Sequence, residues 1–318
     1  MFIFQWHLFM SNLFAIIETM RCLYAVLVLL VLSALVGCSG PSIKPKKHKK
    51  KQVQGQEQPV DLRVFKQSVK GDSLQMSWSW EDYSGNVFQV QYQIAQKDIE
   101  RSKNNRVELR ESPMVKNSPD YGMLTDFDAK TLKPLAKSLK QLAKDNQFNE
   151  RQTAEMVITM VQNIEYTLVH PYSHSDMEKI DKDNGGSFIA EYHGQSEHKP
   201  WNKTPYGGCE EMIDPAGVYS PVEFLCTFRG DCDTRTITVY TLLKLLNIES
   251  IVVNGPGHSM LALPYSPSNP AAPIIQCKGQ NYYFLETTVF IKNEQFIGPQ
   301  IGDVPQEFDA KQWFPVLI

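Results

Sequence analysis

Three side chains in the last third of the chain have the types and the order that thiol catalysis requires. Cys232 follows Gly-Asp, His258 follows Gly-Pro-Gly, and Glu286 follows Tyr-Phe-Leu. A thiol attacks a carbonyl carbon once an imidazole takes its proton, and a carboxylate can fix the orientation of that imidazole. The three residue types therefore predict nucleophilic catalysis through an acyl-enzyme, with Cys232 as nucleophile, His258 as base and Glu286 as the orienting acid.

The segment after Cys232 predicts a helix that begins at the cysteine. It has an apolar stripe at helical spacing, which ends before Asn247 and comprises Ile237, Tyr240, Leu243 and Leu246. Free amides and the positive end of the helix dipole favour a thiolate at such a position, whereas Asp231 and Asp233 oppose it. A cationic partner is then needed, and with His258 in that role we expect the pKa of Cys232 to lie below about 7.

Three strand-like runs place the other two side chains. Residues 251–254 and 259–263 are rich in β-branched and apolar residues on either side of His258, and residues 281–285 end at Glu286. A histidine at a strand start and an acid at a strand end can meet the first turn of the helix. An alternative leaves Glu286 on the surface, with Asp231 or Asp233 serving His258 instead.

These motifs together resemble the transglutaminase-like superfamily over residues 145–300. The resemblance is carried by Gly-Asp-Cys-Asp, Gly-His before a strand, Tyr-Phe-Leu-Glu-Thr-Thr, and the upstream stretches 161–166 and 219–225. It implies an α+β, papain-like core in residues 121–318, in which a cysteine-bearing helix packs on an antiparallel sheet. Cys232 and His258 match the family's nucleophile and base, while Glu286 stands where the family commonly has Asp.

The function expected from this resemblance is a thiol enzyme acting on amide bonds of a protein or peptide substrate. Water as acceptor gives peptidase or amidase chemistry, and an amine gives transamidation; we prefer peptide hydrolysis. The alternative is a non-catalytic lipoprotein that uses the same fold as a binding scaffold. No cofactor or metal is expected. Residues 181–192 resemble a calcium loop, but they have Tyr192 where the loop's last ligand belongs, so we do not expect calcium there.

The amino-terminal residues indicate export and lipidation. Residues 1–37 contain a basic Arg21, an apolar run and the ending Leu-Val-Gly before Cys38, a pattern typical of a signal peptide. This ending resembles the lipobox of bacterial lipoproteins, which implies cleavage before Cys38 and lipid attached to it. A transmembrane anchor is the alternative. Residues 38–59 then form a lysine-rich tether, and Ser39 favours the outer membrane, facing the periplasm.

The cysteines and the net charge bear on the expected disulfides and on the class of partner. In an oxidising periplasm we expect a Cys209–Cys226 disulfide and an unpaired Cys277; a bridge to Cys232 would instead remove the enzyme. The formal charge of −3 includes six lysines between residues 44 and 51 together with Glu57, and residues 1–37 are neutral, so residues 60–318 carry −8. Such an acidic globular part disfavours nucleic acid as a partner.

The residues between the tether and the site predict a β-rich region, 60–120, followed by two helices. Alternating apolar residues on either side of Ser84-Gly85-Asn86 indicate a hairpin, whose tryptophans we interpret as core. Helical spacing recurs across residues 132–142 and 154–164, and Asn149 with Gln152 predicts a cap for the second helix.

Overall fold

The alternating apolar residues of the predicted hairpin form two long antiparallel strands. In the computed structural model β2 (Ser73–Glu81) pairs with β3 (Val87–Ala95), so that Trp80 lies opposite Phe88. Every second side chain of β3 is buried, as one covered sheet face requires. The carboxylate of Asp82 accepts the backbone N–H groups of Ser84 and Asn86 in the connecting turn. The predicted hairpin is confirmed.

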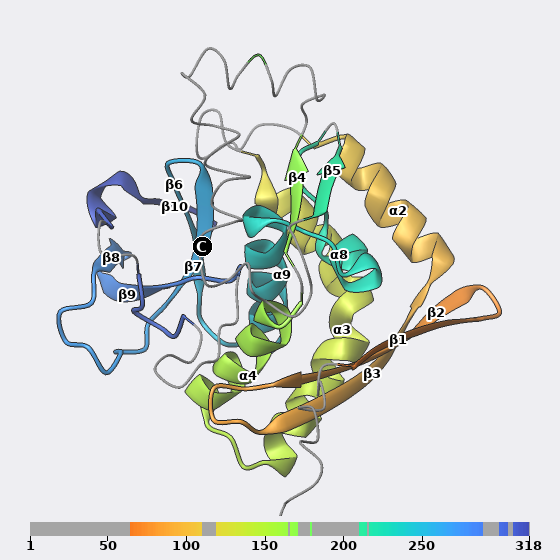
Figure 1. Ribbon diagram of the computed structural model, residues 1–318, viewed down its shortest axis with the longest axis horizontal. Coiled ribbons are helices and arrows are strands. Elements are labelled where there is room, and N and C mark those ends of the chain that lie inside the picture. Colours follow the sequence, from red (N-terminus) through yellow and green to blue (C-terminus); the bar gives the residue numbers. More distant parts are fainter. Residues whose placement is uncertain are drawn as a thin grey trace, which may run out of the picture. The chain divides into compact units, whose positions relative to one another are not determined.

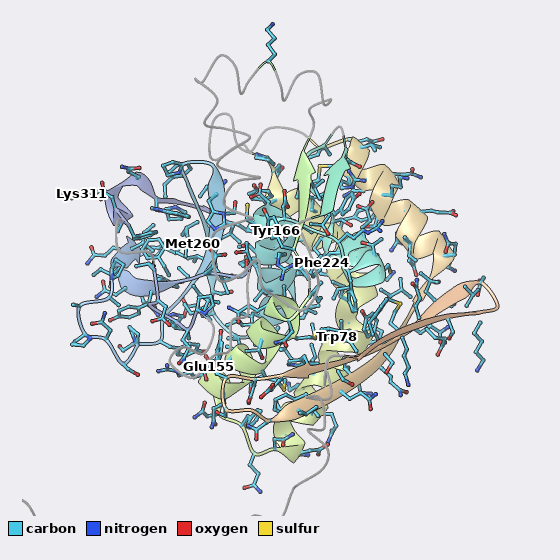
Figure 2. The ribbon with its side chains drawn as sticks, viewed as in Figure 1. Trp78, Glu155, Tyr166, Phe224, Met260 and Lys311 are labelled. Carbon is cyan, nitrogen blue, oxygen red and sulfur yellow. The ribbon has the colours of Figure 1, made fainter. Side chains whose placement is uncertain are left out.

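The tryptophans of this hairpin are core residues, as expected. β1 (Val64–Lys70) completes a three-stranded sheet of order β1-β2-β3. The indole N–H groups of Trp78 and Trp80 donate to the carbonyl oxygens of Met160 and Met156 on α4 (Glu150–Gln162), at 3.0 and 3.1 Å. Each indole thereby buries its ring without leaving a donor unsatisfied. In Figure 2 Trp78 lies on the side of this sheet that faces the helices.

Both predicted helices are present, and the second has the predicted cap. α3 (Tyr121–Asp145) buries its leucines, and α4 begins with a capping box between Asn149 and Gln152. Such a cap is worth about 1 kcal/mol. The structure differs from the sequence analysis between residues 96 and 107. This part of the predicted β-rich region forms helix α2 (Gln96–Val107), whose polar sequence shows no apolar stripe.

Helix α9 (Cys232–Leu245) occupies the centre of the fold. It contacts α3, α4 and the short helix α8 (Pro221–Thr227) on one side and a sheet on the other, as Figure 1 shows. That sheet is antiparallel throughout, in the order β10-β6-β7-β9-β8. Its strands are β6 (Ile251–Gly255), β7 (His258–Leu263), β8 (Ile274–Cys277), β9 (Gln280–Leu285) and β10 (Phe314–Leu317).

Three short elements complete the described structure. β4 (Thr167–His170) and β5 (Glu210–Ile213) form a parallel pair, and a 3-10 helix, η3 (Ala310–Gln312), precedes β10. The fold is thus α+β, with its two larger sheets antiparallel, in agreement with the predicted class. One hydrophobic core joins β2, β3, α3, α4, α8 and α9, and residues 59–318 form one compact unit. The predicted boundary after residue 120 falls inside this unit.

The structure describes residues 64–109, 119–164, 166–170, 179, 210–214, 216–288, 299–304 and 308–317. The predicted signal peptide, residues 1–37, the tether, residues 38–59, with Cys38, and the calcium-like stretch 181–192 lie outside these residues, as does Cys209. Within the described parts, no helix combines the length and apolar character needed to cross a bilayer.

Candidate active site

Cys232 lies at the first position of α9, as its sequence context predicts. The side chain of Asp231 caps the helix by accepting the Thr234 N–H at 3.2 Å. Gly230 is required just before this cap, since a Cβ there would come within 2.4 Å of the Thr234 side chain and 2.8 Å of Phe224. The Gly-Asp-Cys sequence therefore has a packing reason: the chain enters α9 in close contact with its own first turn.

His258 lies at the first position of β7, directly across the sheet–helix interface from α9. β6 and β7 are joined by Pro256-Gly257, and Gly257 has φ of 65°, a conformation that glycine adopts without strain. β7 packs against α9. The turn therefore places His258 at the start of the strand that packs against the helix bearing Cys232.

Glu286 follows β9 and makes a short hydrogen bond with His258. Its Oε2 lies 2.6 Å from His258 Nε2, while its Oε1 accepts the Thr288 N–H at 2.9 Å. The backbone carbonyl of Glu286 accepts the side-chain amide of Gln162 on α4 at 2.6 Å. Both the side-chain carboxylate and the backbone carbonyl of Glu286 are thus held by hydrogen bonds. The alternative in which Asp231 or Asp233 partners the imidazole is not what the hydrogen bonds show.

The pKa values of this pair show how strongly its members interact. Burial favours the neutral form of both, but the opposite charges and their hydrogen bond prevail. The pKa of His258 is raised above its ordinary value by Glu286, with further contributions from Asp233 and Asp231. The pKa of Glu286 falls to about 2, helped by Thr288. Glu286 therefore remains ionised over the whole physiological range.

The thiol of Cys232 faces a carboxylate, and this contradicts one expectation. Its Sγ donates to Asp233 Oδ1 at 3.3 Å and receives the backbone N–H of Ser259, the residue after His258. Between the two described side chains of Cys232 and His258 there is no hydrogen bond. Burial, Asp233 and Asp231 raise the pKa of the thiol well above its ordinary value. The prediction of a pKa below about 7 is therefore wrong for this arrangement, because burial of the thiol, together with Asp233 and Asp231, outweighs the helix terminus.

Two further residues lie at the acidic groups beside Cys232: Asp231, which the sequence analysis considered, and Tyr121, which it did not single out. Tyr121, the first residue of α3, is buried, and its hydroxyl donates to Asp233 Oδ2. Asp231 is buried beside Asp233, and the two effects together raise its pKa. Nothing in the local pattern around Tyr121 reveals its role, because it lies more than a hundred residues away in the chain.

Arg235 lies beneath the site and is fully buried. Its guanidinium donates to the backbone carbonyl oxygens of Thr287, Val161 and Ile164 at 3.1, 2.8 and 2.7 Å. Burial lowers its pKa to about 10. The rings of Tyr166 and Phe224 flank the guanidinium, and both side chains lie near α9 in Figure 2. Arg235 joins the segment after Glu286 to the end of α4. The one sequence signal was its place in Gly-Asp-Cys-Asp-Thr-Arg.

Trp313 packs against the outer side of the imidazole. Its ring lies edge-on to His258, with centroids 6.0 Å apart, and it also packs against Phe284 of β9. Gly255 provides the space, because a Cβ there would approach the Trp313 ring to 2.5 Å. Trp313 precedes β10, at the far end of the chain, and no spacing in the sequence pointed to it.

The other two cysteines that the structure describes are thiols. Cys226 is free and buried in α8, where its side chain belongs to the main hydrophobic core, and Cys277 is also free and buried. The predicted Cys209–Cys226 disulfide stays a prediction, because Cys209 lies outside the described residues, while Cys226 itself is present as a thiol. Burial raises the pKa of Cys226 to about 12. Cys232 is the partly accessible cysteine of the three described.

In the part of the chain that the structure describes, no group of three or more His, Cys, Asp or Glu side chains is placed to hold a metal ion. Comparisons with protein-family models, with curated proteins and with solved structures find no match. What the site can do is therefore inferred from its own side chains: a partly accessible thiol, an imidazole on the neighbouring strand, and a carboxylate that fixes the imidazole.

Proposed function

We propose that the protein is a thiol enzyme that acts on amide bonds of proteins or peptides, with Cys232, His258 and Glu286 as its catalytic triad. The observation that carries this proposal is the 2.6 Å hydrogen bond between His258 Nε2 and Glu286. It leaves the other ring nitrogen, Nδ1, as the proton acceptor, on the strand that packs against the helix bearing Cys232. A papain-like, transglutaminase-like core fits this order of helix and antiparallel strands.

Formation of the acyl-enzyme begins with proton transfer. The thiol of Cys232 first leaves Asp233 and gives its proton to Nδ1 of neutral His258, while Sγ bonds to the carbonyl carbon of the scissile amide. Amides in the first turn of α9, which have no intrahelical acceptors, can receive the carbonyl oxygen as it gains charge. Collapse of this adduct breaks the C–N bond, and the imidazolium returns the proton to the leaving amine.

Release of the acyl group repeats the same steps with a new nucleophile. His258 takes a proton from water, the oxygen attacks the thioester carbon, and the C–S bond breaks as the thiolate regains a proton. The products are a carboxylic acid and free Cys232. An amine in place of water gives a new amide. Glu286 remains ionised throughout and stabilises the imidazolium formed in each half-reaction. Hydrolysis is our preferred outcome.

The binding-scaffold alternative is favoured by a specific observation. The Cys232 thiol bonds to Asp233 rather than to the imidazole, and its pKa is raised. A protein that only binds its partner needs no reactive thiol. The two proposals differ in what Cys232→Ala does, because only the enzyme loses its function when Sγ is removed.

A mixed peptide library tests the proposal directly. Purified protein is incubated with the library, with and without a primary amine, and mass spectrometry detects cleaved, deamidated and amine-linked products together. We expect products from the wild type and none from Cys232→Ala or His258→Ala, while Cys277→Ala, which removes a buried thiol, stays active. Products that persist in Cys232→Ala, or their absence from the wild type across the whole library, would overturn the enzyme proposal in favour of the scaffold.

The proposed site of action is the bacterial cell envelope. It is supported by the lipobox-like ending before Cys38, by the lysine-rich residues 38–59 and by Ser39. We propose that lipid on Cys38 anchors the domain to the outer membrane, facing the periplasm. Mass spectrometry of membrane-extracted protein should show a chain that begins at a diacylated Cys38. An unmodified residue 38 inside a longer chain would reject the anchor without affecting the chemistry.

A further inference from the structure

Asp233 makes two contacts that divide its carboxylate between the thiol and a buried phenol. Its Oδ1 accepts the Sγ–H of Cys232 at 3.3 Å, and its Oδ2 accepts the hydroxyl of Tyr121. Because Tyr121 is almost wholly buried at the start of α3, its hydroxyl holds Oδ2 in one place. The other oxygen is thereby directed at the sulfur.

The contact with Asp233 disfavours the thiolate form of Cys232, and local structure alone does not explain why an acid stands at this position. Asp233 is in the first turn of α9 but does not cap it, since Asp231 does so. Among the described side chains, the hydrogen-bond partner of the partly exposed His258 is Glu286, at Nε2, and not Asp233. Besides accepting the buried Tyr121 hydroxyl, Asp233 therefore sets where the thiol hydrogen points.

From this geometry, and resting on the proposed function, we propose that Asp233 is a positioning residue, fixed by Tyr121, that keeps the Cys232 thiol protonated and directed away from His258 in the resting protein. The nucleophile is then formed by proton transfer to His258 when an amide is bound, and not in advance. A resting thiol of this kind is poorly reactive toward oxidants and electrophiles, which react with thiolates.

The charges around the sulfur support the proposal. Asp231, the N-cap of α9, and Asp233, in its first turn, both act on the thiol, and Arg235 of α9 also interacts with it. His258 at the start of β7 is bound by Glu286 at the end of β9, and Tyr121 of α3 holds Asp233. The acids of α9 disfavour the thiolate, and the same acids favour the imidazolium. Removing the charge of Asp233 should therefore free the thiol, while the His258–Glu286 hydrogen bond keeps its partners.

Alkylation of the thiol tests this without any substrate. The rate of Cys232 modification by iodoacetamide is measured against pH by peptide mapping, for the wild type, for Asp233→Asn and for Asp126→Asn. The last is a control with the same charge change at an exposed residue that pairs with Lys244. We expect slow modification of the wild type at pH 7, about tenfold faster modification of Asp233→Asn, as a shift of one pKa unit gives, and no change in Asp126→Asn.

Two further measurements keep the proposal open to contradiction. Tyr121→Phe leaves the charge of Asp233 in place but no longer holds its Oδ2, so modification at pH 7 should be faster than in the wild type by up to about threefold, less than in Asp233→Asn, since the charge effect is the larger one. A rate equal to that of the wild type would contradict the role given to Tyr121. If Asp233→Asn does not fold, the wild type alone decides: a midpoint of alkylation below pH 7 would overturn the proposal, and one above pH 9 supports it. Equal rates in the wild type and in folded Asp233→Asn would overturn it as well.

The outcome for the proposed function is read separately, from the peptide library. If the wild type turns over peptides and the alkylation rate is the same in Asp233→Asn, the role of Asp233 is rejected and the enzyme proposal is retained. A thiol released by Asp233→Asn in a protein without turnover would reject the enzyme and keep the protonating effect of Asp233 on Cys232.

Discussion

Two buried clusters of charged side chains in this protein differ in whether their members stabilise or oppose one another's charges. In the first, Arg106 of α2 donates from Nε and Nη2 to Glu223 at 2.6 and 2.9 Å, and from Nη1 to Asp214 at 2.5 Å. Burial alone would lower the pKa of Arg106, but the two carboxylates raise it above its ordinary value. Glu223 also belongs to the capping box of α8. Every charge here stabilises its neighbour, so the cluster joins α2 to α8.

The candidate active site has the opposite balance. Three carboxylates, those of Glu286, Asp233 and Asp231, act on His258. The cation Arg235 donates to backbone carbonyl oxygens, and burial lowers its pKa to about 10. Asp231 and Cys232 both have raised pKa values because each is buried beside another acid. Groups that oppose one another persist where function requires them. The comparison therefore predicts that changes in the first cluster affect stability, and changes in the second affect chemistry.

Glu286→Gln should have the largest effect. The amide keeps the shape of the side chain but no longer neutralises the imidazolium, and it can stabilise the wrong tautomer. We expect a loss of about two to four orders of magnitude in kcat/KM on a peptide that the wild type cleaves, as for triad acids generally, with little change in melting temperature. Glu223→Gln is the matched control and should keep its turnover per folded molecule. Activity of Glu286→Gln within about threefold of the wild type would leave Cys232 and His258 as a dyad.

Arg106→Met should have the next largest effect, on stability alone. It leaves two carboxylates without their cation in a buried position, which costs about 3–5 kcal/mol. Arg101→Met is the control, because Arg101 is partly exposed and pairs with Asp98 one turn away, so that its loss should cost less than about 1 kcal/mol. Denaturant unfolding measures both. Equal losses in the two variants would show that the buried cluster is no more stabilising than a surface pair.

The pH dependence of activity should follow His258 and not Cys232. His258 accepts the thiol proton only when it is neutral. Because its pKa is raised, kcat/KM should rise with pH, and the midpoint of this rise should lie above pH 6.5. Glu286, with a pKa of about 2, adds no acid limb in this range, and the raised pKa of Cys232 gives no falling limb below about pH 9. In Glu286→Gln the midpoint should move to lower pH, because the charge that raised it is gone. A rising limb unmoved by this change would assign it to another group.

The sequence alone was sufficient for elements with a regular pattern. The alternation around Trp78 and Trp80 predicted the β2–β3 hairpin, and the stripe after Cys232 predicted α9 and placed the cysteine at its first residue. The strands at His258 and before Glu286 were predicted in the same way. Helix α2 was not, because its polar sequence has one narrow buried side, occupied by Ser102 and Arg106, which make hydrogen bonds instead of apolar contacts.

The contacts that set the chemistry of the site come from distant parts of the chain. Tyr121 reaches Asp233 from α3, Gln162 reaches Glu286 from α4, and Trp313 approaches His258 from the segment before β10. Helix-terminus chemistry suggested a lowered pKa for Cys232, and Asp231 and Asp233 were recognised from the sequence as opposing it. The sequence did not reveal that the thiol is buried, which is the largest cause of its raised pKa. Burial and long-range contacts of this kind depend on tertiary packing, which the spacing of residues within one element does not report.

The smallest expected effect comes from the packing between Gly255 and Trp313. In Gly255→Ala the new Cβ would lie 2.5 Å from two atoms of the Trp313 ring, so the ring must move, and with it the edge that contacts His258. Overpacking of this kind costs about 1–3 kcal/mol of stability. Because the Glu286 hydrogen bond still holds the imidazole, turnover should fall by less than about tenfold, well short of the loss expected for a triad acid. Trp313→Leu in the same chain makes room for the methyl group, so the double variant should recover stability relative to Gly255→Ala, a coupling that a double-mutant cycle measures. Additive losses would show that the two residues act on the site independently, and that His258 is oriented by Glu286 without help from the ring.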